Sequence, residues 1–281
     1  MRSTLQFCLI AVLVLANTAW AQPDCRRFGV VNQRTPLLTA QYWNPILHYV
    51  SEKSGVPLCL SMGKTDRDTV AMIKRGDVEF ALTARLFDGD GRTLDYRVLA
   101  RPEGPGVRAQ IVVLEDSPIR SLQQLAGSEV AFPSTDAPIA YKATMAALRS
   151  EGIKVVPSFS GNVEGAVGQL KSGRVAAAGV NSKIIEEFSR RENLRYRVLW
   201  SSRSYPDFAL TARASVPASV AQAVRDAFLD MPNDPRGLKI LRESAAMVGS
   251  KEVMRFVPAT IKDYETYRPL HRNEPPENSP E

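Results

Sequence analysis

Two short stretches, Ile73-Lys74-Arg75-Gly76-Asp77-Val78 and Leu170-Lys171-Ser172-Gly173-Arg174-Val175, decide the fold of this chain. Each has the end of a helix, a glycine suited to a left-handed helix cap, and the start of an apolar strand. A second pair of glycines, Gly55 and Gly152, has the same spacing of 97 residues. Two generic helix-glycine-strand connections could coincide, but the equal offset at both favours two lobes of like topology.

Strands and helices alternate on both sides of this repeat. The expected strands are residues 28–31, 57–62, 78–83, 110–114, 129–132, 175–180 and 208–212. The expected helices are a segment through Trp43 and Val50 that ends at Gly55, and then residues 65–75, 140–149, 161–171, 219–230, 236–246 and 261–267. This order predicts an α/β protein in which each lobe is a mostly parallel sheet flanked by helices.

The chain is expected to cross between the lobes twice. Residues 101–106, Arg-Pro-Glu-Gly-Pro-Gly, form a cluster of helix and strand breakers that is typical of a boundary. The return passes through Trp200 to Pro206 into the strand at 208–212. We therefore expect one lobe to comprise residues 22–103 and 209–281, and the other residues 104–208. The polar, proline-rich end, residues 273–281, is expected to be disordered.

The first 21 residues match a secretory signal peptide. Arg2 supplies the positive charge, Phe7 to Ala16 the apolar segment, and Ala19-Trp20-Ala21 the cleavage site. The apolar segment is shorter than the ~20 residues of a membrane-spanning helix, which disfavours the alternative of an uncleaved anchor. The sequence thus predicts a soluble protein exported to the periplasm.

Two cysteines, Cys25 and Cys59, remain once Cys8 leaves with the signal peptide. They lie beside and within neighbouring predicted strands, which can bring two Cα atoms within the ~4.4–6.8 Å that a disulfide requires. Export to an oxidising compartment favours a disulfide over the alternative of two buried thiols. A lipidated Cys25 is disfavoured because Gln22-Pro23-Asp24 lacks small apolar residues.

Composition and motifs exclude several function classes. The chain has 36 Lys and Arg against 30 Asp and Glu, and the basic residues are scattered, so nucleic acid is not an expected partner. Only His48 and His271 are available for histidine chemistry, and neither has metal-ligand spacing. Asp88-Gly89-Asp90-Gly91 lacks the glutamate that would complete a calcium loop and is expected to be a polar turn. Neither a cofactor nor enzyme activity is expected.

Short motifs resemble the phosphonate-binding periplasmic proteins of ABC transporters over about residues 27–265. The resemblance rests on these segments in their order: Gly29-Val30, Trp43-Asn44-Pro45-Ile46, Gly55-Val56, Gly76-Asp77-Val78-Glu79, Asp116-Ser117-Pro118-Ile119, Ser121-Leu122-Gln123-Gln124-Leu125, Trp200-Ser201-Ser202 and Tyr205-Pro206. It implies a type II binding protein, with two lobes that close by a hinge around a small solute. Its partner would be an ABC permease or, alternatively, a membrane sensor kinase, and we expect a monomer.

The ligand loop of that family is changed in this sequence. Members that bind phosphonates usually carry Ser-Thr-Ser-Gly at the start of the second lobe's first helix, where this chain has Asp136-Ala137-Pro138-Ile139. Asp136 would repel an anion, and Pro138 has no N–H to donate. Ser134 and Thr135 could partly compensate. Asn162-Val163-Glu164 occupies the region where the family places a histidine.

Polar residues at the carboxyl ends of the predicted strands form the candidate ligand site, because ligands of parallel sheets bind at that edge. The candidates are Gln33, Arg34, Lys64, Thr83, Arg85, Ser134, Thr135, Asp136, Asn162, Asn181 and Tyr205. The cations Arg34, Lys64 and Arg85 predict a solute with an acidic group. Asp136 or Glu164 would meet an ammonium, so a zwitterion is the expected ligand. The alternative is that these side chains simply face solvent.

Overall fold

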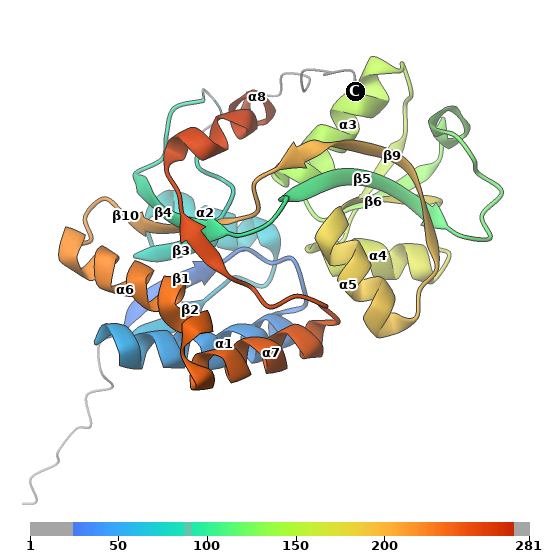
Figure 1. Cartoon of the computed structure of the whole chain (residues 1–281). Helices are drawn as coiled ribbons and strands as arrows, with labels where there is room; N and C mark the ends of the chain where they lie inside the picture. The colour runs from blue at the N-terminus through green and yellow to red at the C-terminus, as the bar shows by residue number, and fades with distance from the viewer. Residues whose placement is uncertain (1–24, 88, 90, 273–281) are drawn as a thin grey trace, which may run out of the picture.

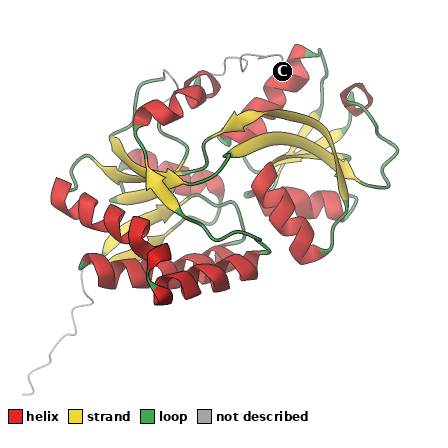
Figure 2. Cartoon of the chain, in the orientation of Figure 1, coloured by secondary structure: helices red, strands yellow, loops and turns green. Residues whose placement is uncertain are grey.

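The computed structural model describes residues 25–87, 89 and 91–272, and its strands form two separate sheets that helices cover (Figures 1 and 2). The predicted signal peptide and the tail at 273–281 lie outside these described residues. Among the described helices, none is long and apolar enough to span a membrane.

The first lobe contains a six-stranded sheet with the order β11-β4-β10-β3-β1-β2. Its strands are β1 (Arg26–Val30), β2 (Leu58–Ser61), β3 (Phe80–Thr83), β4 (Tyr96–Pro102), β10 (Ala209–Arg213) and β11 (Phe256–Pro258). Its helical elements are α1 (Pro36–Ser54), α2 (Asp66–Arg75), α6 (Ala218–Asp230), η3 (Met231–Asn233), α7 (Pro235–Val248), η4 (Ile261–Tyr267) and α8 (Arg268–His271). Helices α1, α6 and α7 lie together on one side of this lobe (Figure 1).

The second lobe contains a five-stranded sheet with the order β7-β6-β8-β5-β9. Its strands are β5 (Val107–Leu114), β6 (Glu129–Phe132), β7 (Val156–Phe159), β8 (Ala177–Asn181) and β9 (Tyr196–Tyr205). Its helical elements are the 3₁₀ turn η1 (Leu122–Leu125), the π-helical turn η2 (Pro138–Ala143), α3 (Thr144–Ser150), α4 (Val163–Lys171) and α5 (Ser182–Glu192). The predicted two-lobe α/β fold is confirmed.

Both sheets are mixed, whereas the sequence predicts mostly parallel ones. Strands β2-β1-β3 and β7-β6-β8 are parallel, as expected from the repeat. Strand β10 begins, and β4 ends, at the crossings between the lobes, so β10 runs antiparallel to β3 and β4. Likewise β5 begins and β9 ends there, so β5 runs antiparallel to β8 and β9. The two crossings therefore account for these antiparallel pairs, and β11 adds a further antiparallel pair with β4.

The repeat of glycines has a structural counterpart in each lobe. Gly55 and Gly152 follow the first helices of the two lobes with φ of 68° and 69°, and Gly76 and Gly173 follow the second helices with φ of 72° and 71°. Residues with a side chain rarely adopt this left-handed conformation, so glycine ends each helix and turns the chain towards the next parallel strand.

Aromatic side chains fill the core of the first lobe, and a disulfide ties its edge. The ring of Phe28 lies 6.0 Å from that of Trp43 and 6.5 Å from that of Phe80, so α1 is fixed against the centre of the sheet. Cys25 and Cys59 form a disulfide with a Cα–Cα distance of 5.7 Å. Because β1 and β2 are parallel neighbours, the predicted bridge forms and is confirmed.

The C-terminal segment holds the second crossing in place. The hydroxyl of Tyr264 donates to the carbonyl of Asp207 at 2.6 Å, and the hydroxyl of Tyr267 donates to the carbonyl of Pro206 at 2.6 Å. Both tyrosine side chains are fully buried. Bonded at two consecutive carbonyls, the crossing presents Asp207 in a fixed position between the lobes.

Candidate functional site

The two lobes meet directly at the carboxyl ends of their parallel strands. The backbone N–H of Asp66 donates to the carbonyl of Gly161 at 2.8 Å, and the N–H of Glu164 donates to the carbonyl of Gln33 at 3.1 Å. Each bond joins the start of a helix in one lobe to a loop of the other. The structure therefore shows the lobes closed upon each other.

Arg85 and Asp66 form a buried ion pair at one corner of this contact, with a Nη2–Oδ2 distance of 2.6 Å. The same carboxylate accepts a hydrogen bond from the hydroxyl of Ser134 in the other lobe. Arg85 Nε also donates to the carbonyl of Asp136 at 3.1 Å. Burial raises the pKa of Asp66, and the attraction of Arg85 and the Ser134 bond only partly offset this effect. The Arg85 charge is thus met by the chain's own carboxylate.

Arg34 forms a second buried ion pair, this time across the two lobes. Its guanidinium bonds to the carboxylate of Glu187 on α5 and lies 5.3 Å from the ring centre of Tyr42. Arg34 and Glu187 are only 8% and 2% exposed. Burial alone would lower the pKa of Arg34, but the Glu187 carboxylate outweighs it and the pKa is raised. Because each partner is desolvated, each depends on the other.

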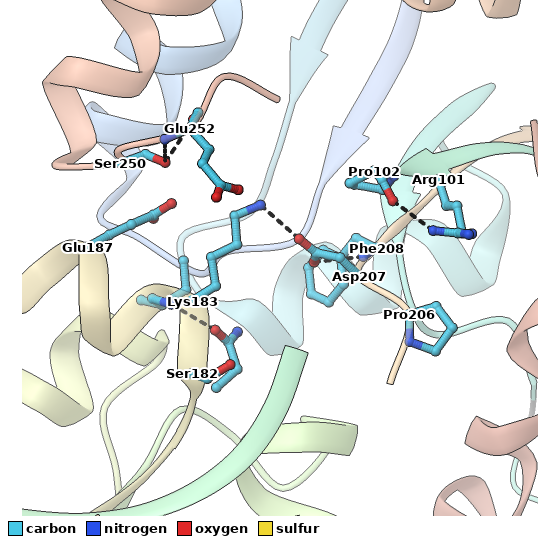
Figure 3. A network of polar contacts seen from close by, with 12 residues as sticks. Arg101, Pro102, Ser182, Lys183, Glu187, Pro206, Asp207, Phe208, Ser250 and Glu252 are labelled. Carbon is cyan, nitrogen blue, oxygen red and sulfur yellow. Dashed lines mark hydrogen bonds and ion pairs between the residues drawn. The ribbon is translucent and has the colours of Figure 1, made fainter. Parts of the chain in front are cut away.

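Lys183 and Asp207 form a third pair, with a Nζ–Oδ2 distance of 2.8 Å (Figure 3). Burial would raise the pKa of Asp207, yet the Lys183 ammonium and the N–H of Phe208 hold it below its ordinary value. The pKa of Lys183 is raised, since the attraction of Asp207 exceeds the opposing effect of burial. This pair joins the start of α5 to the second crossing.

A fourth pair joins Glu164 at the start of α4 to Arg191 on α5, at 2.9 Å. Glu164 also accepts a bond of 3.4 Å from the backbone N–H of Thr35 in the first lobe. The four cations Arg34, Arg85, Lys183 and Arg191 are therefore matched by four carboxylates. The net charge of these four pairs is therefore zero.

Cavities lined by the described residues also lie where the lobes meet. The corner beside Arg85, Asn181 and Ala137 holds only about 20 Å³ of space. A recess of about 30 Å³ lies beside Arg34 and Gln33. It shares Tyr42, Lys183 and Asp207 with a larger cavity of about 460 Å³ next to the two crossings.

The comparisons with known proteins agree with this two-lobe arrangement. The sequence model of a family described as the phosphonate periplasmic substrate-binding proteins of ABC transporters matches residues 28–264. This chain belongs to that family. Membership makes it a periplasmic substrate-binding protein for a small molecule, with an ABC permease as its partner. None of the curated protein sequences matches the chain.

Solved structures of binding proteins share the fold at low identity. PhnD1 of Prochlorococcus marinus in complex with methylphosphonate has a TM-score of 0.72 at 16% identity, covering 89% of this chain and 98% of that one. A binding protein component of an ABC phosphonate transporter from Pseudomonas aeruginosa has a TM-score of 0.72 at 15% identity, covering 88% and 85%. An ancestral arginine-binding protein bound to arginine has a TM-score of 0.56 at 18% identity, covering 78% and 97%.

Among the other predicted ligand residues of this binding protein, several support the loops at the contact. Thr83 is buried and its hydroxyl accepts the N–H of Arg85 at 3.0 Å. Asn162 and Asn181 cap α4 and α5, where their side-chain oxygens accept the N–H groups of Gly165 and Ile184 at 2.7 and 2.8 Å. These caps place the starts of both helices at the contact.

The remaining predicted residues differ in exposure. Gln33 is half-buried and lines both the corner and the recess. Lys64 and Thr135 are exposed, and Asp136 is half-buried. Tyr205 is buried, with its ring centre 5.3 Å from that of Tyr267 beside the second crossing. The structure thus brings together Gln33, Arg34, Arg85, Ser134 and Asn181, while Lys64 and Thr135 lie towards solvent.

Sequence reasoning missed Asp66, Lys183, Glu187 and Asp207, because charged residues in helices and loops are usually solvated. The repeat contained a signal for one of them. Arg85 lies two residues after the end of β3, and Lys183 lies two residues after the end of β8, the equivalent strand. Comparison of the lobes strand by strand would have paired these two cations. Within the described residues, no cluster of His, Cys, Asp and Glu could hold a metal ion.

Proposed function

We propose that this binding protein captures a small polar solute of low net charge between its lobes and delivers it to the permease. The observation that carries this proposal is the set of four ion pairs at the contact, whose charges cancel. A solute with one acidic and one basic group can exchange partners with such pairs and leave no buried charge unpaired. An unpaired buried charge is costly, so net-neutral solutes are favoured.

The exchange would begin in an open form, in which the Arg34–Glu187 pair across the lobes is broken. The acidic group would bind at Arg85 or Arg34, with Lys64 near the entrance, and displace Asp66 or Glu187. The released carboxylate, Asp136 or Glu164 would then take the ammonium group. Gln33, Thr83, Ser134, Thr135, Asn162, Asn181 and Tyr205 would supply uncharged contacts. A dianion would free two carboxylates without providing a cation, and would bind more weakly.

The ligands bound in two related structures show that this fold can bind solutes of different net charge. One neighbour was solved with methylphosphonate and another with arginine, so the same architecture accommodates solutes of either charge. Selection must therefore come from the residues at the contact. In this chain Asp136-Ala137-Pro138 replaces the hydroxyl-rich loop of phosphonate binders, which supports a zwitterion over a bare phosphonate.

A thermal-shift screen followed by calorimetric titration tests the proposal. The mature protein is screened against aminoalkylphosphonates, amino acids, methylphosphonate, phosphate and sulfate. A solute at about 100 times its dissociation constant adds about 2.7 kcal/mol to the free energy of unfolding. We expect zwitterions to bind and the dianions to bind at least about tenfold more weakly. Tight binding of phosphate or methylphosphonate alone would contradict the proposed solute class.

Export and lobe closure are part of the same proposal. We propose cleavage after Ala21, a monomer, and hinge motion of residues 22–103 with 209–281 against residues 104–208. N-terminal sequencing of the periplasmic protein checks the cleavage site. Solution scattering with and without the identified solute checks the motion, since closure reduces the radius of gyration. The family match favours delivery to a permease over presentation to a sensor kinase.

A further inference from the structure

Helix α7 of the first lobe ends against helix α5 of the second (Figure 1). The last carbonyls of a helix have no partners within it, and that end of the helix carries a partial negative charge. Helices α1, α2, α4 and α5 each have a basic residue in their own last turn, whereas α7 has none. The end of α7 therefore depends on cations and donors from elsewhere in the chain.

Two arginines of the second lobe supply these donors to the end of α7. The Nε–H of Arg190 donates to the carbonyl of Gly249 at 2.6 Å. The Nη1 group of Arg191 donates to the carbonyl of Val248 at 3.4 Å. The ion pair of Arg190 with Glu186, one turn earlier on α5, spans 3.8 Å, so the bond across the lobes is the shorter of its contacts. Both arginines thus join the last turn of α5 to the end of α7.

Gly249 permits the close approach of the two helices. It ends α7 with a φ of 79°, and a Cβ added there would lie 2.6 Å from the carbonyl oxygen of Glu187 and 3.2 Å from the backbone nitrogen of Arg191. Both atoms belong to the backbone of α5, which cannot move aside as the end of a side chain can. Gly55 ends α1 with a φ of 68°, and no atom of the described residues lies within 4 Å of a Cβ added there. The left-handed φ explains a glycine at both positions, but only at Gly249 does the other lobe require one as well.

We propose that this contact is a latch, in which Arg190 and Gly249 determine how tightly the protein holds its solute without touching it. Neither residue belongs to those assigned to the captured solute. The latch forms only when the lobes are closed, so it stabilises the closed form relative to the open form. The apparent affinity for a solute enclosed by the lobes rises with the fraction of the protein that is closed. The inference rests on the lobe closure proposed above and adds residues that set affinity from outside the solute contacts.

Comparison of Gly249→Ala with Gly55→Ala isolates the contact between the lobes. Both variants place alanine in left-handed backbone at the end of a first-lobe helix, so both should lower the Tm through local strain. Only Gly249→Ala adds a clash with α5, so it alone should increase the radius of gyration of the solute-free protein in solution scattering. Equal radii of gyration for the two variants would overturn the latch.

Arg190→Met tests the bond to α7 without changing the backbone. The variant loses the donor to Gly249 and should also increase the radius of gyration of the solute-free protein. Arg190→Lys keeps a positive charge at the end of α7 and should restore part of the closed form. Arg174→Met is the matched control, because Arg174 is exposed on the same lobe after the end of α4. A lower Tm for Arg190→Met with the wild-type radius of gyration would show that Arg190 stabilises only its own lobe, and would overturn the latch.

Titration calorimetry measures the effect of the latch on affinity, with the aminoalkylphosphonates, amino acids, methylphosphonate, phosphate and sulfate of the screen as probes. Gly249→Ala and Arg190→Met should each weaken the tightest-binding probe about tenfold, whereas Gly55→Ala and Arg174→Met should bind it as the wild type does. If Gly249→Ala binds with wild-type affinity, the latch is wrong and the proposed function still stands. If none of the probes binds to the wild type, the proposed function fails, and the radii of gyration of the solute-free variants still decide the latch.

Discussion

The two lobes share one type of connection, in which a strand leads through a loop into a helix, but the two loops carry charges of opposite sign. After β1 the chain reads Asn32-Gln33-Arg34-Thr35-Pro36, and after β6 it reads Ser134-Thr135-Asp136-Ala137-Pro138. In each case the proline is at the first helical position, six residues after the strand ends. An arginine in the first loop is thus matched by an aspartate in the second.

The difference extends to how each helix begins. Thr35 caps α1 by accepting the N–H of Leu38 at 3.3 Å, whereas Ala137 gives η2 no side-chain cap and the helix opens with a π turn. The first lobe reaches across with the guanidiniums of Arg34 and Arg85. The second lobe receives them with the Glu187 carboxylate and the Asp136 carbonyl. A shared backbone with unlike loops therefore makes the lobes complementary, and the charges decide what can bind between them.

Removing the carboxylate that accepts the Arg34 hydrogen bond should have the largest effect on stability and on closure of the lobes. Glu187→Ala leaves a buried guanidinium without its partner, and breaking a buried pair in this way costs about 3–5 kcal/mol. We expect a lower free energy of unfolding in urea and a larger radius of gyration, because the closed form loses a contact between the lobes.

The neighbouring residue provides a control for this experiment. Glu186 lies on the same helix, and its surface pair with Arg190 spans 3.8 Å, so Glu186→Ala should cost less than about 1 kcal/mol. Equal losses of unfolding free energy for Glu186→Ala and Glu187→Ala would show that the ion pair between the lobes stabilises the protein no more than a surface pair does.

The disulfide distinguishes the lobes in a different way, because both of its cysteines belong to the first lobe. Cys59→Ser opens a loop closed across 34 residues, and the chain-entropy relation gives a loss of about 3–4 kcal/mol. The loss should appear in the unfolding of the first lobe, and solute affinity should change little. Urea unfolding with and without a reductant checks this, and a wild type insensitive to reductant would argue against it.

The sequence was sufficient for the two-lobe arrangement, though not for the antiparallel strand pairs, because the glycines that end helices have a backbone role that few other residues can fill. Gly55, Gly76, Gly152 and Gly173 all have positive φ, so their spacing revealed the topology of both lobes before any contact was known. The disulfide was predictable as well, since only Cys25 and Cys59 lie beyond the predicted signal peptide.

The pairing of charges was beyond the sequence. Arg34 and Glu187 are 153 residues apart, and nothing local distinguishes Glu187 from the exposed Glu186 beside it on α5. Asp66 is the first helical residue after a capping threonine, a position usually open to water. Its burial depends on closure of the lobes against Ser134. Such residues become visible only when the two halves of the site are brought together.

The helix cap offers a smaller test of the comparison between the lobes. Thr35→Ala removes the hydroxyl that accepts the Leu38 N–H and should cost about 1 kcal/mol, while Thr35→Ser keeps it and should cost less. Thermal unfolding of both variants measures the difference. Equal stability of Thr35→Ala and wild type would mean that α1 begins as well without a cap as η2 does.

The smallest expected effect concerns the pair at the crossing and depends on pH. The pKa of Asp207 is lowered in the folded protein, so its contribution to stability is fully present above its ordinary pKa of about 3.9 and is lost as the pH falls through the lower folded value. The Lys183 side chain is 37% exposed, and water screens the pair, so the contribution should be about 1 kcal/mol or less. We expect Asp207→Asn to be less stable than wild type at pH 7 and the gap to narrow as the pH falls below about 4, because the unfolded carboxyl protonates before the folded one does. Between pH 6 and 9 the gap should stay constant, because the raised pKa of Lys183 keeps the ammonium charged throughout that range. Chemical unfolding of both proteins across this pH series gives the gap, with Asp226→Asn as the control, since the Asp226 side chain is 45% exposed and pairs with Arg225 at the surface. A gap that stays the same down to pH 3 would show that Asp207 stabilises the crossing through its position rather than its charge.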